Sequence, residues 1–257
     1  MGVELRPCLK AFIFALIPGL EEEGNEFFDE ILILLIGLRD MTGPEYFYPA
    51  LWMGMMLMPR HRLAVVNFLT KAMPKVDSAS EFSVLTGGHS DVFVCAWSAA
   101  LSDENVLVQR GLLDLIVVHV PLSKSFLKTK ELEKLTEAVL GVVLRKEMSL
   151  NRRLYAWLLG NSDGAEDQRT YYETHAQAVL TNTLRNALHR PSDDSQDWMR
   201  PLRILISLLD KIEIGGPLVD ALYIDVLQQA FTNVVRNKTS ETEVRALYEY
   251  STKYSWM

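Results

Sequence analysis

Cysteine is nearly absent from this sequence: Cys8 and Cys95 are the two cysteines among 257 residues. Both have apolar neighbours, where a free cysteine behaves as a small hydrophobe. Two such residues cannot build a disulfide framework or a cysteine-based zinc site, so we expect a reducing compartment.

Long hydrophobic runs are also missing. The longest, residues 46–59, falls short of the roughly 20 apolar residues that span a bilayer, and it contains Pro49. Charged Glu4, Arg6 and Lys10 interrupt the N-terminus, which therefore does not resemble a targeting peptide. We expect no transmembrane segment and a soluble, cytosolic chain unless a partner recruits it to a membrane.

Positive charge is in the minority. The formal net charge is −7, which argues against general binding to nucleic-acid phosphates. Apolar residues make up 49% of the chain and charged residues 23%, as in ordinary globular proteins. The length is enough for one large domain or two small ones.

Strand patterns are almost absent, whereas helical periodicity runs along the whole chain. Predicted helices cover residues 6–17, 25–39, 45–58, 61–73, 91–101, 105–120, 128–145, 149–159, 166–189, 197–211, 217–236 and 239–254. Predicted loops at 75–90 and 160–167 divide the helical subregions. Many short-looped helices indicate an all-α fold, an α-solenoid of stacked antiparallel helix pairs of HEAT or armadillo type. A compact all-α bundle is the alternative, because the sequence shows no strict repeat period.

Three local patterns carry further expectations. Residues 25–39 are apolar on nearly every side, which is typical of a helix buried between neighbours. Leu150, Leu154, Trp157 and Leu158 form one apolar stripe on the helix at 149–159. Gly215-Gly216-Pro217 predicts the end of one helix and the beginning of the next.

No pattern of a reaction centre is present. The five histidines show no metal-ligand spacing, and the chain lacks nucleophile-elbow, phosphate-loop and dinucleotide fingerprints. Residues 161–167 match a calcium loop poorly. His89, Ser90 and Asp91 are adjacent, whereas members of a catalytic triad converge from separate segments, so we expect Ser90 or Asp91 to cap the following helix. We therefore predict no catalytic residue, no cofactor and no metal.

Three basic clusters are the candidate lipid-binding or partner-binding surface. Their members are Arg60 and Arg62, Arg145 and Lys146, and Arg152 and Arg153. Such pairs can bind phosphoinositides or an acidic partner surface, and they can equally be solvated helix ends. Arg152 and Arg153 lie opposite the apolar stripe of their helix, where an arginine can also pair with acids on a neighbouring helix.

Long strings of this sequence resemble the N-terminal domain of the Dopey family. They are LRPCLKA from Leu5, LIPGLEEEG from Leu16, DENVLVQRGLLD from Asp103, MSLNRRLYAWLLG from Met148 and IGGP from Ile214. The specific residues within them include Gln109, Arg110, Asn151, Arg152 and Trp157. The resemblance covers most of the chain and is weakest at 75–90, at 161–167 and in the last twenty residues.

The resemblance implies a non-catalytic scaffold that is peripheral to Golgi and endosomal membranes and acts in traffic between endosomes and the trans-Golgi network. Implied partners are a large ARF-exchange-factor-like Golgi scaffold, a phospholipid flippase and kinesin light chain. The alternative that it implies is a membrane-surface module that binds phosphatidylinositol 4-phosphate and links organelles to a kinesin motor.

In one respect the sequence departs from the family. The LRPCLKA string lies well inside the family's domain, after further helices, whereas here it begins at residue 5. We therefore expect residues 1–257 to form a single partial Dopey N-terminal domain from a fragment or a truncated gene model. Terminal repeats of a solenoid normally carry a polar outer face, so the helix at Ala11–Ile17 is expected to present bare apolar surface.

Overall fold

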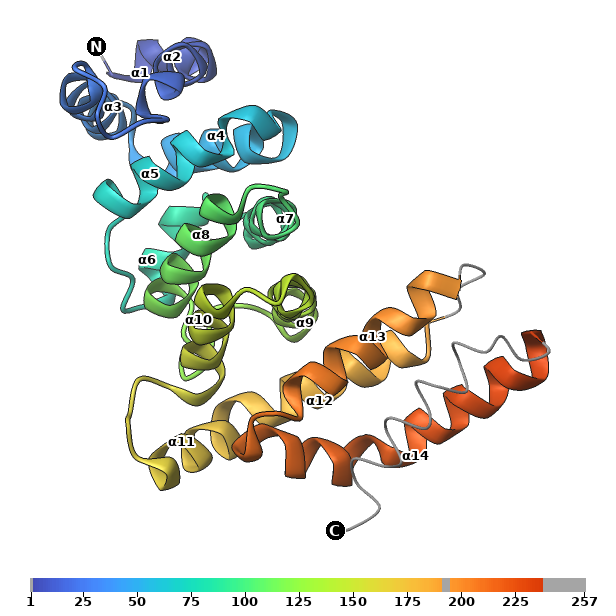
Figure 1. The fold of residues 1–257 in the computed structure, drawn as a ribbon. Coiled ribbons are helices and arrows are strands. Elements are labelled where there is room, and N and C mark those ends of the chain that lie inside the picture. Colours follow the sequence, from blue (N-terminus) through green and yellow to red (C-terminus); the bar gives the residue numbers. More distant parts are fainter. Residues whose placement is uncertain (1, 191–194, 238–257) are drawn as a thin grey trace. The chain divides into compact units, whose positions relative to one another are not determined.

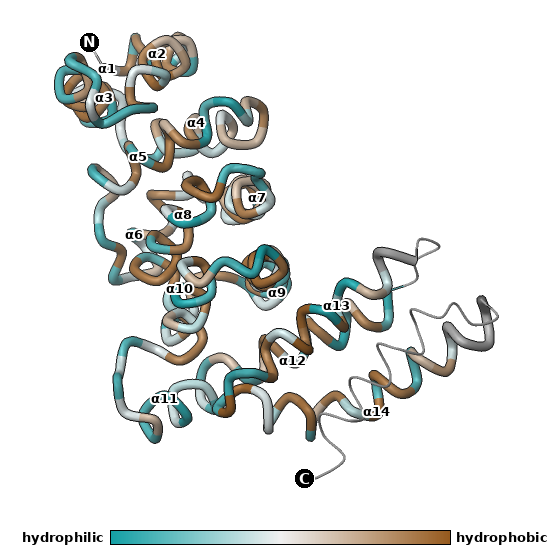
Figure 2. The backbone as a smooth tube through the Cα atoms, viewed as in Figure 1, coloured by the Kyte–Doolittle hydropathy of each residue, from teal (hydrophilic) through white to brown (hydrophobic). Residues whose placement is uncertain are grey.

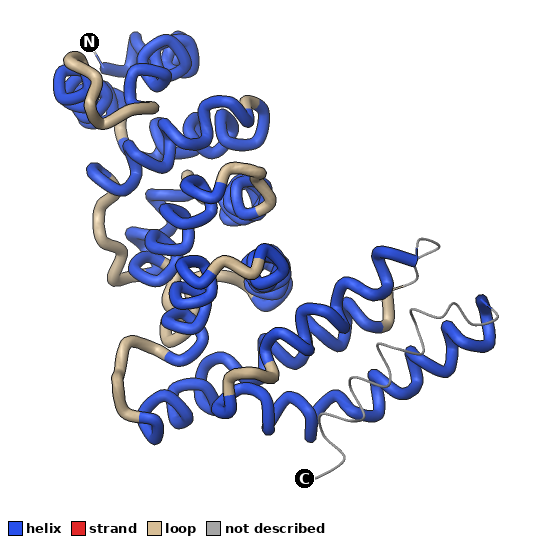
Figure 3. The backbone as a smooth tube through the Cα atoms, viewed as in Figure 1, coloured by secondary structure: helices blue, strands red, loops and turns tan. Residues whose placement is uncertain are grey.

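The computed structural model describes residues 2–190 and 195–237. Within these ranges the chain consists of helices joined by turns, with no strand (Figure 3). Contacts divide it into two compact units: Met1–Val142 with Lys146–Trp157, and Val143–Arg145 with Leu158–Met257. The prediction of an all-α fold is confirmed.

Unit 1 begins with short helical segments, because prolines interrupt the chain early. The α-helices here are α1 (Gly2–Leu5), α2 (Leu9–Leu16) and α3 (Phe28–Thr42). Two 3-10 turns, Arg6–Cys8 and Ile17–Leu20, flank α2, and each carries a proline in its first positions, where the missing N–H costs little. The single helix predicted over 6–17 is therefore broken into three pieces.

Helix α3 corrects one prediction, since it is not buried on all sides. Leu35 and Leu38 lie in the core, but Ile33 is 68% exposed, Leu34 56% and Met41 55%. The segments that pack against α3 are α1, α2, α4 and the 3-10 turn Ile17–Leu20. Hydropathy reports what a helix can bury, and only the arrangement of neighbours decides what it does bury.

The rest of unit 1 is a stack of helix pairs (Figure 1). Its long helices are α4 (Pro44–Leu57), α5 (Arg62–Ala72), α7 (Ser90–Leu101), α8 (Val106–His119), α9 (Thr129–Gly141) and α10 (Met148–Leu159). Helix α7 packs between α4 and α9, and α5 packs on α8. The pattern is that of an all-α solenoid, and its assignment to the HEAT or armadillo type stays a prediction.

An aromatic core holds the first pairs together. Trp52, Phe93 and Trp97 are fully buried, and their rings meet at centroid distances of 4.4 to 6.2 Å. The indole Nε1 of Trp52 donates to the Leu85 carbonyl at 3.0 Å, which satisfies the polar end of a buried ring. Figure 2 shows apolar residues running along these stacked helices.

The loop predicted over 75–90 is wrong in its centre, where helix α6 (Ala79–Thr86) forms. Ser78 accepts from the Glu81 amide at 3.2 Å, while Glu81 accepts from the Ser78 amide at 3.1 Å. This reciprocal capping box is written in the sequence as Ser-x-x-Glu, but the serine content of the segment obscured it. The helix ends at Gly87, whose φ of 58° is left-handed and suits glycine.

Unit 2 is built from α11 (Ala165–Tyr171), α12 (Gln177–Leu188), α13 (Ser195–Leu208) and α14 (Ile212–Asn237), with a π-helical turn, Tyr172–Ala176, joining the first two. The helix end predicted at Gly215-Gly216 is wrong, because α14 begins at Ile212 and runs through both glycines. A Cβ on Gly215 would lie 2.9 Å from the Leu209 carbonyl oxygen, so close backbone approach requires this glycine. The helix predicted at 239–254 lies outside the described residues.

Candidate functional site

Helices α5, α8 and α10 run in the same direction along unit 1. Arg62 of α5 pairs with Asp103, and Val66, one turn later, lies beside Gly111. Later residues of one segment thus contact later residues of the other, so the two segments run parallel. Arg110 and Asp114 of α8 likewise reach Ser149 and Arg153 of α10. The N-terminal ends of the three helices therefore follow one edge of the stack, and most of the predicted cations lie there.

Arg62 is held in an ion pair within this edge. Its Nη1 lies 2.8 Å from Asp103 Oδ2, and the two side chains are only 12% and 14% exposed. Its Nε also donates to the Met55 carbonyl at 2.9 Å, near the end of α4. Arg62 thus joins α4, α5 and the turn before α8.

Arg60 is exposed beside Arg62, and its Nε donates to His61 Nε2 at 3.1 Å. Partial burial and the charge of Arg60 lower the pKa of His61, so this imidazole is neutral at pH 7. Arg60 lines an open groove of about 400 Å³ together with Glu21 and Glu104. The groove carries both signs of charge and is not a cationic pocket.

The pair on α10 divides between two environments. Arg153 Nε lies 2.6 Å from Asp114 Oδ1 on α8, and its Nη1 donates to the Ser149 carbonyl at 2.9 Å. Arg152 is exposed. From the sequence, an arginine of this pair was expected either at a binding surface or paired with an acid on a neighbouring helix. Arg153 is paired with such an acid, Asp114.

The third pair marks the boundary between the units. Arg145 ends the 3-10 turn Val142–Arg145, and Lys146 follows it with a left-handed backbone at φ 57°. Both side chains are exposed. The structure thus ties Arg62 and Arg153 to acids and leaves Arg60, Lys146 and Arg152 at the surface. A role for the six cations in lipid or partner binding stays a prediction.

The specific residues of the Dopey-like strings also lie at joints between helices. Gln109 is buried, and its Nε2 donates to the Leu101 carbonyl at 2.8 Å, where α7 ends. Trp157 Nε1 donates to the Val120 carbonyl at 2.8 Å, just after α8. Arg110 Nη2 donates to Ser149 Oγ at 3.2 Å, and the buried Asn151 Oδ1 has no hydrogen-bond partner among the described residues. These strings therefore encode the packing of successive helices.

Two further joints were predicted differently or not at all. Asn67 of α5 donates from Nδ2 to the Leu20 carbonyl at 2.8 Å, at the end of the turn after α2. Ser90 does not cap α7, whose N-cap is His89 without a side-chain bond; instead Ser90 Oγ donates to Glu131 Oε1 at 2.9 Å. Asp91 lies in the first turn of α7 and is not its N-cap. Their partners are 41 to 47 residues away, so local sequence gives no signal for them.

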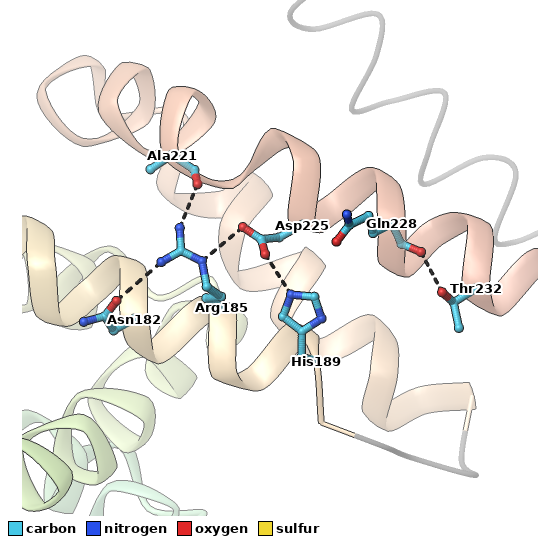
Figure 4. Close-up of polar contacts among 7 residues, drawn as sticks. All are labelled: Asn182, Arg185, His189, Ala221, Asp225, Gln228 and Thr232. Carbon is cyan, nitrogen blue, oxygen red and sulfur yellow. Dashed lines mark hydrogen bonds and ion pairs between the residues drawn. The ribbon is translucent and has the colours of Figure 1, made fainter.

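A polar cluster that sequence reasoning missed joins α12 to α14 within unit 2 (Figure 4). Asp225 accepts from Arg185 Nε at 3.1 Å and lies 2.7 Å from His189 Nε2, and Arg185 Nη2 donates to the Ala221 carbonyl at 3.0 Å. Burial alone would raise the pKa of Asp225, but the bonds from His189 and Arg185 outweigh it, and the pKa is lowered.

Two family descriptions match this chain. Residues 1–163 match the family described as "Dopey, N-terminal", which is more than half of the chain. The chain belongs to the Dopey family. Residues 171–247 match a second Dopey-related description, "DOP1 middle TPR domain". The interval between the two matches lies close to the boundary between the two units.

Similar Dopey proteins come from animals and fungi. Protein DOP1B of Mus musculus is 33% identical over 89% of this chain, which is 11% of the mouse protein. Protein dop1 of Emericella nidulans is 31% identical over 87% of this chain and 15% of its own length. Protein DOP1 of Saccharomyces cerevisiae is 22% identical over 87% and 17%. The chain thus spans less than a fifth of these relatives. No solved structure matches it.

No helix among the described residues is long and apolar enough to cross a bilayer. No group of three or more histidine, cysteine, aspartate or glutamate side chains among them is arranged to hold a metal ion.

Proposed function

We propose that this chain is a non-catalytic scaffold in vesicle-mediated protein transport between endosomes and the trans-Golgi network of the Golgi. The observation that carries the proposal is where the Dopey motif residues lie. Gln109, Arg110 and Trp157 hold helices together instead of converging on a reaction centre. A sequence that maintains a helical stack maintains an extended binding surface, which is the usual use of a solenoid.

The partners we propose follow from the family: a large ARF-exchange-factor-like Golgi scaffold, a phospholipid flippase and kinesin light chain. The groove beside Arg60 is one place where such a partner can bind. Its mixed charges, Arg60 against Glu21 and Glu104, suit a polar protein segment better than an anionic headgroup. We propose that the chain is cytoplasmic and peripheral on Golgi and endosomal membranes.

The test is recovery of the ARF-exchange-factor-like scaffold from cytosol on the immobilised 257-residue chain. We expect the wild type to retain it and an Arg60→Glu/Glu104→Lys double variant to retain less. This variant leaves net charge unchanged. The matched control, Lys10→Glu/Glu166→Lys, also preserves net charge and changes two other exposed side chains. Failure of the folded wild-type chain to retain the scaffold contradicts the proposal.

A second candidate function, binding to phosphatidylinositol 4-phosphate, has its own supporting observation. Lys146 and Arg152 are exposed at the start of α10, where the helix dipole also favours an anion. Arg153 does not belong in this test, because it neutralises Asp114 and its loss would weaken the stack.

Liposome flotation with and without this lipid tests the candidate. Lipid-dependent flotation should fall in a Lys146→Glu/Arg152→Glu variant and persist in a Lys10→Glu/Lys130→Glu control, which adds the same charge at other exposed positions. Equal flotation of the two variants removes this role from Lys146 and Arg152.

A further inference from the structure

Exposed charges of alternating sign follow the edge of unit 1 where α5, α8 and α10 begin. Glu21 follows the turn after α2, Arg60 precedes α5, Glu104 precedes α8 and Lys146 precedes α10. All four residues are exposed, and they lie 39, 44 and 42 residues apart along the chain. Such regular intervals indicate equivalent turns of successive helix pairs. We call these four residues the corner charges.

The joints between these turns use other charged side chains. Arg62 and Asp103 pair with each other, and little of either side chain is exposed. The corner charges Glu21, Arg60 and Glu104 line one open groove of about 400 Å³, yet none of them forms an ion pair with a described residue. The packing of the stack therefore does not require them, and they remain available to a ligand.

The exposure of this groove does not depend on further helices at either end of the stack. In a solenoid each helix pair contacts the pair before it and the pair after it, so added pairs pack on the two end faces. Arg60 and Glu104 belong to inner pairs, because α5 packs on α8 and α7 packs between α4 and α9. The edge between Arg60 and Glu104 stays open whatever covers the ends.

The spacing and the signs of the corner charges select an extended, charged chain. Neighbouring stacked helices lie about 8–10 Å apart, and an extended chain rises about 3.3 Å per residue. About three residues of an extended segment thus span the distance from one corner to the next. Such a segment matches the edge when basic residues lie opposite Glu21 and Glu104, and acidic residues opposite Arg60 and Lys146.

We propose that the corner charges bind an extended segment of a partner protein in which basic and acidic residues alternate about every third position. The proposal rests on the scaffold function and names the kind of segment that the groove beside Arg60 binds. An anionic membrane carries one sign of charge, so Glu21 and Glu104 would repel it along this edge.

The groove also favours a segment over a second copy of the chain. An antiparallel copy would match the charges by placing its Glu104 opposite Arg60. Because Arg60 and Glu104 line the groove, the two grooves would then face each other and leave the space between them unfilled. A narrow segment fills the groove and meets the same charges.

The probe is a fluorescent peptide of about ten residues with lysine, glutamate, lysine and glutamate at every third position, separated by glycine and serine. The control peptide has the same composition, with both lysines before both glutamates. Anisotropy titration of the 257-residue chain at low ionic strength should show tighter binding of the alternating peptide. Added salt should weaken this binding, because the contacts are exposed.

Charge reversal locates the binding. Arg60→Glu should weaken binding of the alternating peptide about tenfold, whereas Lys130→Glu, the same charge change at an exposed position of α9, should leave it unchanged. A peptide whose first glutamate is replaced by lysine should bind the Arg60→Glu variant again and should not gain affinity for Lys130→Glu. Loss of folding cannot produce such a rescue.

Several outcomes would overturn the proposal. These are absence of binding, equal binding of the control peptide, equal effects of the two variants, and failure of the rescue. A wild-type dimer in sedimentation velocity that Arg60→Glu dissociates would show that the occupant is a second copy. Phosphatidylserine vesicles that bind the wild type and not Arg60→Glu would show that it is a membrane. If the chain retains the Golgi scaffold from cytosol without binding the peptide, the segment proposal fails and the scaffold function stands.

Discussion

The two units fasten their helices in different ways. In unit 1, separate polar side chains join successive segments: Asn67 reaches the turn after α2, Arg62 reaches Asp103, Gln109 reaches the end of α7, and Arg153 reaches Asp114. In unit 2, the described polar contacts between α12 and α14 centre on Arg185, which bonds to Asp225 and to the Ala221 carbonyl, and His189 is a second partner of Asp225. The bonds of Asn67 and Gln109 contain no titrating group, so this part of unit 1 should tolerate acid. The contacts of Asp225 lower the pKa of its carboxyl, so they should be lost when acid protonates it.

The largest effect is expected at Trp157, which is among the largest fully buried side chains. Trp157→Ala should destabilise unit 1 by about 3–5 kcal/mol, since it leaves a cavity and removes the donor to the Val120 carbonyl. Hydrogen exchange resolved by segment should show lost protection in α8 and α10. Trp157→Phe keeps most of the ring and should cost less. Equal losses in the two variants would mean that the hydrogen bond, not the packing, dominates.

Removing Arg62 should have the next largest effect. Arg62→Ala removes the cation beside the poorly exposed Asp103 carboxylate, and we expect a loss of about 3 kcal/mol. Arg60→Ala is the matched control, since Arg60 is an exposed neighbour and should cost less than about 0.5 kcal/mol. Urea unfolding measures both. Similar midpoints for the two variants would show that the ion pair is not a structural joint.

Unit 2 should be weakened by Asp225→Asn, by about 1–3 kcal/mol at neutral pH. The pKa of Asp225 is lowered, so its contribution is fully present above the ordinary value of 3.8 and is lost as pH falls through the lowered value. The difference from wild type in α12–α14 protection should therefore shrink on strong acidification. Asp220→Asn, at an exposed position of α14, is the control and should show no such pH dependence.

The smallest effect is expected at the boundary residue Lys146. Its φ of 57° is unfavourable for a side chain with a Cβ, so Lys146→Gly should raise the unfolding free energy by up to about 1 kcal/mol. Thermal melting checks this, with Lys130→Gly as a control that should destabilise α9. A fall in melting temperature for Lys146→Gly would contradict the inferred strain.

The helices themselves were largely predictable. Apolar periodicity and the glycine and proline positions placed α4, α5, α7 and α8 within a few residues of their bounds. Predictions failed where one signal concealed another. The serines around 75–90 concealed the capping box of α6, and Gly215-Gly216 suggested an end where close packing against Leu209 required glycine.

The candidate site was less predictable, because its meaning depends on distant partners. Sequence alone marked Arg62 and Arg153 as cations, but Asp103 and Asp114 lie 41 and 39 residues away. Hydropathy likewise marked residues 25–39 as apolar, but only the packing of neighbouring segments decided that Leu35 is buried and Ile33 exposed.

The sequence by itself determined that this protein is helical and that it belongs with the Dopey proteins, because periodicity, caps and specific strings are local properties of a chain. The tertiary structure decided which charged side chains join helices, which ones face solvent and which apolar side chains of α3 are exposed. These features depend on contacts between side chains that are far apart in the sequence, and a local sequence pattern does not reveal such contacts.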